Sequence, residues 1–180
     1  MRILKEDTIA LLIDVQERLM PHIFEAEKLE KNLNILVEGL NLLHVPIIVS
    51  EQYKKGLGET IASLKELVVN CPHNEKTAFS CCDEPTIQER IELSGRRNII
   101  LFGVEAHVCL LQTAIDLKER GFNPIVVVDC ISSRTIENKM IAIERYKQEG
   151  VTLTSYESIL FELCRVAQGD AFKAMSKLVK

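Results

Sequence analysis

Three short segments of this 180-residue chain, residues 8–13, 98–102 and 124–128, are apolar at almost every position. A strand with one face in water alternates apolar and polar residues, whereas a strand covered on both faces shows no such alternation. Buried strands of this kind are typical of parallel sheets packed between two layers of helices. These segments therefore constrain the fold more than any other feature of the sequence.

The segments between these strands have helical spacing. Apolar residues recur every three or four positions from Leu29 to Leu43, at Ile87 and Ile91, and from Val108 to Ile115. Residues 46–49 and 151–154 are two weaker strand candidates. Alternating strands and helices predict an α/β chain with a three-layer, doubly wound Rossmann-like fold and a mostly parallel sheet of five or six strands. The length suits one domain covering residues 1–180.

Composition excludes several classes of function. The chain has 22 basic and 26 acidic side chains, a net charge of −4, so no broad positive field favours nucleic acid. The apolar runs fall far short of the roughly 20 residues that span a membrane, and residues 1–7 do not resemble a secretory signal. We therefore expect a cytoplasmic protein whose cysteines are free thiols. They are Cys71, Cys81, Cys82, Cys109, Cys130 and Cys164.

Sheets of this type bind ligands at the carboxyl ends of their strands, where two candidate residues occur. Asp14 directly follows the first strand and could accept a proton, although it could also cap a helix. Cys109 stands near the start of the helix after the 98–102 strand, where free N–H groups and the helix dipole stabilise a thiolate. It could equally be a small core residue. A third candidate, Lys76, would by itself be read as a solvated surface charge.

Three motifs resemble those of the isochorismatase-like cysteine hydrolases in order and spacing. They are LLIDVQ at 11–16, EKTAFS at 75–80 and, most specifically, GVEAHVC at 103–109. The similarity extends over nearly the whole chain and includes VDCISSR at 128–134. The segment SEQYKKGLG at 50–58 further suggests the small single-domain branch of this family rather than a nicotinamidase.

The resemblance implies an Asp-Lys-Cys triad, carried over to Asp14, Lys76 and Cys109. Cys109 would attack a carbonyl carbon, Asp14 would take and return the proton, and Lys76 would hold Asp14 in place. The family often has a non-proline cis peptide, here matching Val104–Glu105. The backbone at Val104, Glu105 and Cys109 would then face the oxyanion. The retained thiol implies hydrolysis of a C–N bond in a small amide, carbamoyl or imide substrate.

Other implications concern specificity, metal and assembly. Ala106 stands where relatives commonly have Ser or Thr, which leaves the substrate open. Nicotinamidases of the superfamily hold a metal with histidines after the second strand, but residues 51–55 contain none, so we expect no metal and no cofactor. Phe24, Tyr53 and His107 could shape the pocket or serve only in packing. Relatives form dimers or larger assemblies, so a homo-oligomer is expected.

Two alternatives remain open. The chain could be a catalytically silent binding or assembly protein on the same scaffold, since activity resides in the site rather than the fold. An active site predicts a Cys109 thiol that titrates below about 8.5, and a silent scaffold predicts an unreactive thiol. Zinc binding is the other alternative, although its ligands would not have the usual spacing. They would be Cys71, His73, Cys81 and Cys82.

Overall fold

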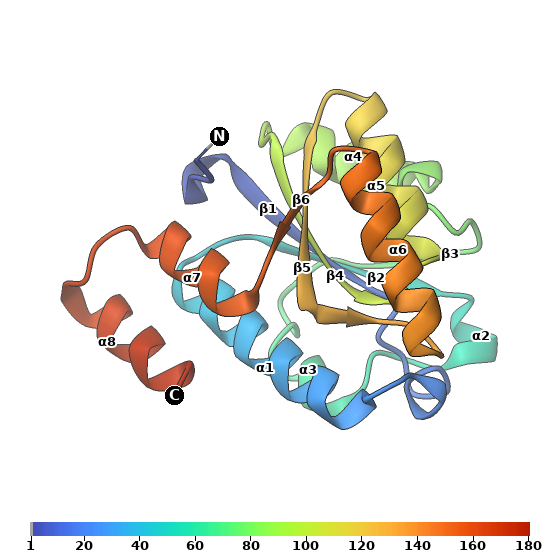
Figure 1. Ribbon diagram of the computed structural model, residues 1–180, viewed down its shortest axis with the longest axis horizontal. Helices are drawn as coiled ribbons and strands as arrows, with labels where there is room; N and C mark the ends of the chain where they lie inside the picture. The colour runs from blue at the N-terminus through green and yellow to red at the C-terminus, as the bar shows by residue number, and fades with distance from the viewer. Residues whose placement is uncertain (1) are drawn as a thin grey trace.

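The computed structural model describes residues 2–180 and has one central sheet in which all six strands run parallel (Figure 1). The strands are β1 (Thr8–Ile13), β2 (Ile47–Gln52), β3 (His73–Lys76), β4 (Asn98–Val104), β5 (Asn123–Ser132) and β6 (Thr152–Thr154). Their order is β3-β2-β1-β4-β5-β6. The chain thus builds outward from β1 in one direction and from β4 in the other. The expected doubly wound α/β fold is confirmed.

Helices cover both faces of the sheet (Figure 1). One face carries α1 (Ala26–Leu42), α3 (Ala62–Lys65), α7 (Tyr156–Cys164) and α8 (Gly169–Leu178). The other carries α4 (Pro85–Leu93), α5 (Cys109–Glu119) and α6 (Ile136–Gln148). A short helix, α2 (Lys54–Leu57), follows β2. The result is a three-layer arrangement with the sheet in the middle.

The position of β1 between two layers of helices explains why its sequence does not alternate apolar and polar residues. Leu12 packs into the core under α1, whereas Leu11 packs into the core under α5, and both side chains are buried. Successive side chains of a strand point to opposite faces, so a strand between two helical layers needs apolar residues at every position. The same holds for β4, which is buried throughout.

The sequence analysis missed the short helices α2 and α3, the helix α8, the strand β3 and the helix α6. The strand β3 is an edge strand with an exposed-buried alternation and the polar sequence HNEK, so it lacks the apolar signal that marks the central strands. The helix α6 is mostly polar and buries little more than Ala142 and Tyr146. The apolar residues Ile159, Leu160 and Leu163 of α7, by contrast, are buried within the chain itself. No helix within residues 2–180 has the length and apolarity of a membrane span.

Candidate active site

Asp14 is the first residue after β1, at the centre of the sheet. Its backbone has a φ of 54°, in the left-handed region that is uncommon for residues other than glycine. Its N–H donates to the Ser50 carbonyl of β2 at 3.1 Å, and its side chain is completely buried. A buried carboxylate at a strand end is costly unless partners satisfy it.

Lys76, the last residue of β3, supplies one of those partners. Its ammonium group donates to Asp14 Oδ2 at 2.8 Å and to Gln52 Oε1 at 2.6 Å. The carbonyl oxygens of Ala78 and Phe79 lie 3.3 and 3.2 Å away. Burial disfavours the charged form, but the neighbouring Asp14, Cys81 and Cys109 side chains together outweigh it and raise the pKa of Lys76. Lys76 is therefore a buried cation paired with a buried anion.

Cys109 is the first residue of α5 and is only 7% exposed. Its position at a helix N-terminus predicts a lowered thiol pKa, but the structure gives the opposite direction. Burial and the adjacent Asp14 carboxylate raise the pKa of Cys109, and Lys76 opposes them only in part. The charge of the Asp14 carboxylate is the second cause of this shift, after burial. The three residues that sequence reasoning singled out thus come together at one buried point.

The backbone before Cys109 has an unusual course. The Val104–Glu105 peptide bond is cis, as the resemblance implies. The Ala106 N–H donates to the Ser132 carbonyl at 2.8 Å. Within the described part of the chain, the N–H groups of Glu105 and Cys109 have no hydrogen-bond acceptor. Two backbone donors beside the thiol are therefore available to another molecule.

The segment is held from outside by two side chains. The Tyr146 hydroxyl of α6 donates to the Ala106 carbonyl at 2.5 Å in a buried contact. The Arg134 side chain donates to Glu105 Oε2 at 3.0 Å. These contacts fix the segment between β4 and α5.

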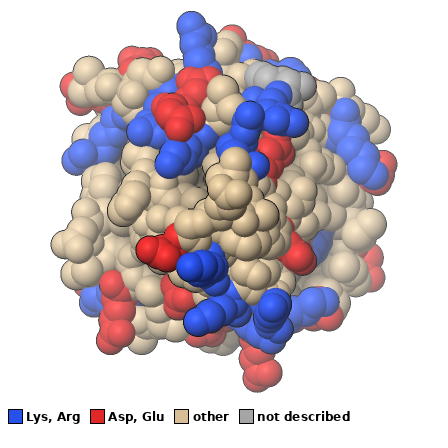
Figure 2. Space-filling view, turned by 90° about the vertical axis from the view of Figure 1, so that its left-hand side faces the viewer, with Lys and Arg blue, Asp and Glu red and all other residues tan. Residues whose placement is uncertain are grey.

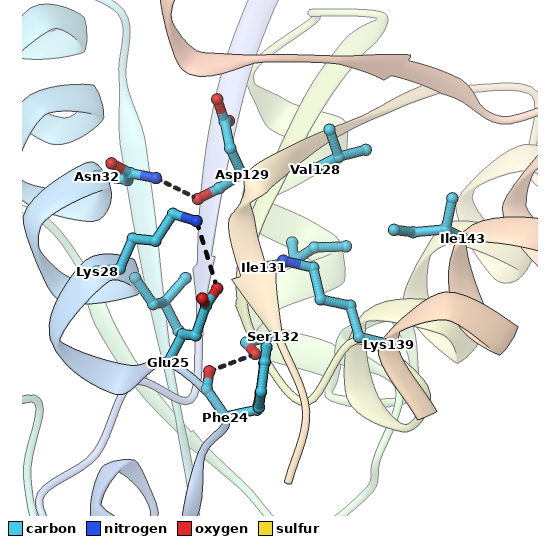
Figure 3. A pocket seen from close by; sticks show the side chains of 11 residues that line it. Phe24, Glu25, Lys28, Asn32, Val128, Asp129, Ile131, Ser132, Lys139 and Ile143 are labelled. Atoms are coloured by element: carbon cyan, nitrogen blue, oxygen red, sulfur yellow. Dashed lines mark hydrogen bonds and ion pairs between the residues drawn. The ribbon is translucent and has the colours of Figure 1, made fainter. Parts of the chain in front are cut away.

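The three candidate pocket residues lie in different surroundings. Tyr53 is 51% exposed and donates its backbone N–H to the Lys76 carbonyl at 2.8 Å. The ring of His107 is half-buried, with Nδ1 2.9 Å from the Ser133 hydroxyl. Phe24 instead lines a separate cavity of about 190 Å³ between α1, β5 and α6 (Figure 3).

That cavity has both polar and apolar walls. The Lys139 side chain extends into it from α6, and burial lowers the pKa of Lys139 (Figure 3). On its opposite wall Lys28 pairs with Glu25, and the Ser132 hydroxyl donates to the Phe24 carbonyl at 2.8 Å. None of the triad candidates lines it.

Residues 8–158 match the isochorismatase domain model, which is most of the chain. The chain belongs to the isochorismatase family. Membership of this family supports a hydrolase role. The resemblance inferred from the three motifs is confirmed.

Individual members of the isochorismatase family match over nearly the whole chain. Isochorismatase domain-containing protein 1 of Salmo salar is 38% identical over 96% of this chain, which spans 61% of that longer protein. A solved structure from Caenorhabditis elegans, described as MAR1 ribonuclease, is 37% identical with a TM-score of 0.93 and covers 99% of this chain and 92% of its own. An Escherichia coli structure described as an octameric hydrolase of unknown specificity has a TM-score of 0.93 at 23% identity, covering 98% and 90%. That last likeness concerns the fold alone.

Sequence reasoning missed several residues of this isochorismatase-like site. Ser50 donates its hydroxyl to Asp14 Oδ1 at 2.7 Å, and Gln52 accepts from Lys76. Both lie at the carboxyl end of β2, which was a weak strand candidate. Their position at a strand end beside β1 was the signal that could have identified them.

Metal binding was tested against the side chains present. No three His, Cys, Asp or Glu side chains of residues 2–180 come together so that they could hold a metal ion, and the proposed zinc ligands are no exception. All six cysteines are free thiols, as expected. The absence of a catalytic metal or cofactor stays a prediction, which metal analysis of the purified protein will test.

Proposed function

We propose that this isochorismatase-like hydrolase cleaves a C–N bond of a small amide, carbamoyl or imide substrate, with Cys109 as nucleophile. Asp14 acts as the base and later the acid, and Lys76 positions Asp14. One observation carries the proposal. A buried carboxylate lies against the Cys109 thiol while a lysine ammonium, 2.8 Å away, satisfies its other side.

The raised pKa of Cys109 determines how the nucleophile would form. A thiol whose pKa is raised by burial and a neighbouring carboxylate is protonated at neutral pH. An active site with a thiolate before substrate binds requires a lowered pKa, so the raised pKa of Cys109 by itself favours the catalytically silent protein. The adjacent Asp14 carboxylate supports catalysis in another way, because it can take the proton as the sulfur attacks.

The proposed reaction has two steps. The Cys109 sulfur bonds to the substrate carbonyl carbon, its proton passes to Asp14, and the C=O electron pair moves to the oxygen. When the C–N bond breaks, the leaving amine takes the proton from Asp14 and a thioester remains. Water then attacks the thioester carbon, passing one proton through Asp14 to the departing sulfur, and the acid is released.

The negative oxygen of the two tetrahedral intermediates needs hydrogen-bond donors. The N–H groups of Glu105 and Cys109, which lack acceptors within the described residues, could supply them. The neighbouring N–H of Ala106 could not, because it donates to Ser132. These N–H groups support the backbone donors that the resemblance implies at Glu105 and Cys109. Val104 is the last residue of β4, directly before them, and its part in binding the oxyanion stays a prediction.

The test is a substrate screen of small amides, ureides and carbamates with the parent protein and Cys109→Ala. We expect turnover by the parent and none by the variant, with an acyl or alkyl adduct found by mass on Cys109 of the parent. Cys130→Ala is the control, because Cys130 is also buried but lies in the other core. Hydrolysis by Cys109→Ala at the parent's rate would refute the nucleophile.

The ribonuclease name of the Caenorhabditis elegans structure suggests RNA as a second candidate substrate. Against it, the net charge of this chain is −4, and Figure 2 shows basic and acidic side chains interspersed on the face in view. We therefore expect no RNA cleavage. Incubation of labelled RNA with the parent and Cys109→Ala tests this, and cleavage by the parent alone would favour the second candidate.

Assembly and location also remain proposals. The octameric description of the Escherichia coli structure, together with the expectation from sequence, supports a homo-oligomer. We propose that it works in the cytoplasm on a small molecule, which cell fractionation would test.

A further inference from the structure

A buried chain of hydrogen bonds connects Asp14 to Cys109 on the side away from Lys76. It begins at Ser50, whose hydroxyl donates to Asp14 Oδ1 at 2.7 Å while its carbonyl accepts from the Asp14 N–H at 3.1 Å. Ser50 therefore holds both the backbone and the carboxylate of Asp14. It is completely buried, so water does not compete for these bonds.

Cys81 fixes the direction in which the Ser50 hydroxyl donates. It belongs to the short 3-10 helix η3 (Cys81–Asp83), and its thiol donates to Ser50 Oγ at 3.6 Å. Burial raises the pKa of Cys81 to about 11, so at neutral pH it keeps the proton that it donates. With its oxygen accepting from Cys81, the Ser50 hydroxyl has Asp14 as its own acceptor.

The chain continues to the nucleophile. The Cys81 N–H donates to Thr113 Oγ1 at 2.9 Å, and the Thr113 hydroxyl donates to the Cys109 carbonyl at 2.7 Å. Cys81 and Thr113 are both completely buried. Hydrogen bonds thus connect Asp14 with Cys109 through three intervening residues, Ser50, Cys81 and Thr113.

We propose that Ser50 is a positioning residue, which orients the Asp14 carboxylate toward the Cys109 thiol and is itself oriented by Cys81 and Thr113. Lys76 holds Oδ2 and Ser50 holds Oδ1, so the carboxylate cannot rotate and the thiol meets a fixed acceptor. This inference rests on the proposed function, since it concerns the same proton transfer. The Ser50 hydroxyl donates to Asp14 rather than to the Cys109 thiol, so Ser50 acts through Asp14.

The test follows alkylation of Cys109 by iodoacetamide between pH 5 and 9, which needs no known substrate. Peptide mass mapping separates Cys109 from the half-buried Cys71 and Cys164. In the parent we expect a plateau at neutral pH, where the Asp14 carboxylate takes the thiol proton. Asp14→Asn should abolish the plateau, and if it alkylates as fast as the parent, the proposed function itself fails.

Ser50→Ala tests the further inference alone. The neutral plateau should fall about tenfold or more, the size expected for one hydrogen bond to a charged group. Ser50→Thr keeps the hydroxyl and should stay within about twofold of the parent in the same assay.

The matched control is Thr8→Val, which removes a completely buried hydroxyl from the far end of β1. It should lower the unfolding midpoint without changing the alkylation profile. Cys81→Ala should lower the plateau in the same way as Ser50→Ala, by less. The inference is overturned if Ser50→Ala keeps the parent's plateau, if Ser50→Thr is as slow as Ser50→Ala, or if Thr8→Val loses the plateau equally.

Discussion

The Asp14–Lys76 pair shows how a single residue can depend on the rest of the fold. Each side chain is at most 1% exposed, so each charge is tolerable only because the other is present. Lys76 stands in a polar strand, and nothing in the sequence distinguishes it from a surface lysine. The motif resemblance could identify it, whereas spacing could not, because burial arises from how β3 pairs with β2.

Lys76→Met should therefore lower the free energy of unfolding by about 3–5 kcal/mol, since it leaves the Asp14 carboxylate buried without its cation. Urea unfolding at pH 7 measures this change. The double variant Asp14→Leu/Lys76→Met should recover much of the loss. Lys147→Met, which removes an exposed pair with Glu144, is the control and should give no resolvable change. Equal losses in Lys76→Met and Lys147→Met would contradict a buried Asp14–Lys76 pair.

Among the elements, η3 carries two thiols that the solvent does not reach. Burial raises the pKa of Cys82 from 9.0 to about 12. A group whose pKa is raised in the folded state contributes stability that is complete below its unfolded pKa. That contribution is lost as the pH rises from about 9 toward the folded value.

Cys82→Ala should therefore flatten the fall in stability between pH 9 and 11. The difference in slope should approach 1.4 kcal/mol per pH unit, the value for one proton. Urea unfolding of the parent and the variant at several pH values in this range, under reducing conditions, gives the two slopes. Parallel curves would show that the Cys82 thiol titrates normally.

The junction of β1 and β4 depends on a glycine. Gly103 has a φ of 118°, and a Cβ at this position would lie 2.2 Å from the Ile13 carbonyl oxygen of β1. Only glycine allows the two strands to approach this closely where Asp14 follows Ile13. The sequence contains this glycine within the GVEAHVC motif, but its steric role depends on the pairing of two distant strands.

Gly103→Ala should destabilise the protein by about 3 kcal/mol or more, because backbone rather than a flexible side chain must move. Gly95→Ala is a matched control, since Gly95 also has a positive φ of 66° but no atom within 4 Å of the added Cβ. It should cost only about 1 kcal/mol. Thermal or urea unfolding of both variants measures the difference, and similar losses would refute the steric explanation.

Prediction from sequence succeeded where a local pattern decides the structure. The buried strands β1, β4 and β5 had continuous apolar runs, and the helices α1 and α5 had clear apolar periodicity. Prediction failed for β3 and α6, among other elements, because their formation depends on neighbours, and the lowered pKa expected for Cys109 has the opposite direction in the structure. The N-terminal position of Cys109 on α5 was recognisable, but its burial beside Asp14 arises only when β1 and α5 meet.

At the scale of the whole molecule, several large apolar side chains remain exposed. They include Leu93 at 79%, Val69 at 69%, Ile141 at 66% and Val166 at 62%. We predict that light scattering gives a mass of at least twice the 20.4 kDa of one chain. Dilution in the same experiment is the control for weak association, and one mass equal to a single chain at all concentrations would contradict the homo-oligomer.

The order of the strands divides the polypeptide into two consecutive halves that meet between β1 and β4. A nick in the exposed turn at Gly95 would leave Asp14 and Lys76 on one fragment and Cys109 on the other. Neither fragment alone would hold both Asp14 and Cys109. Alkylation of Cys109 at neutral pH would then measure how far the two fragments reassociate, because the proposed reactive centre forms only when both are present.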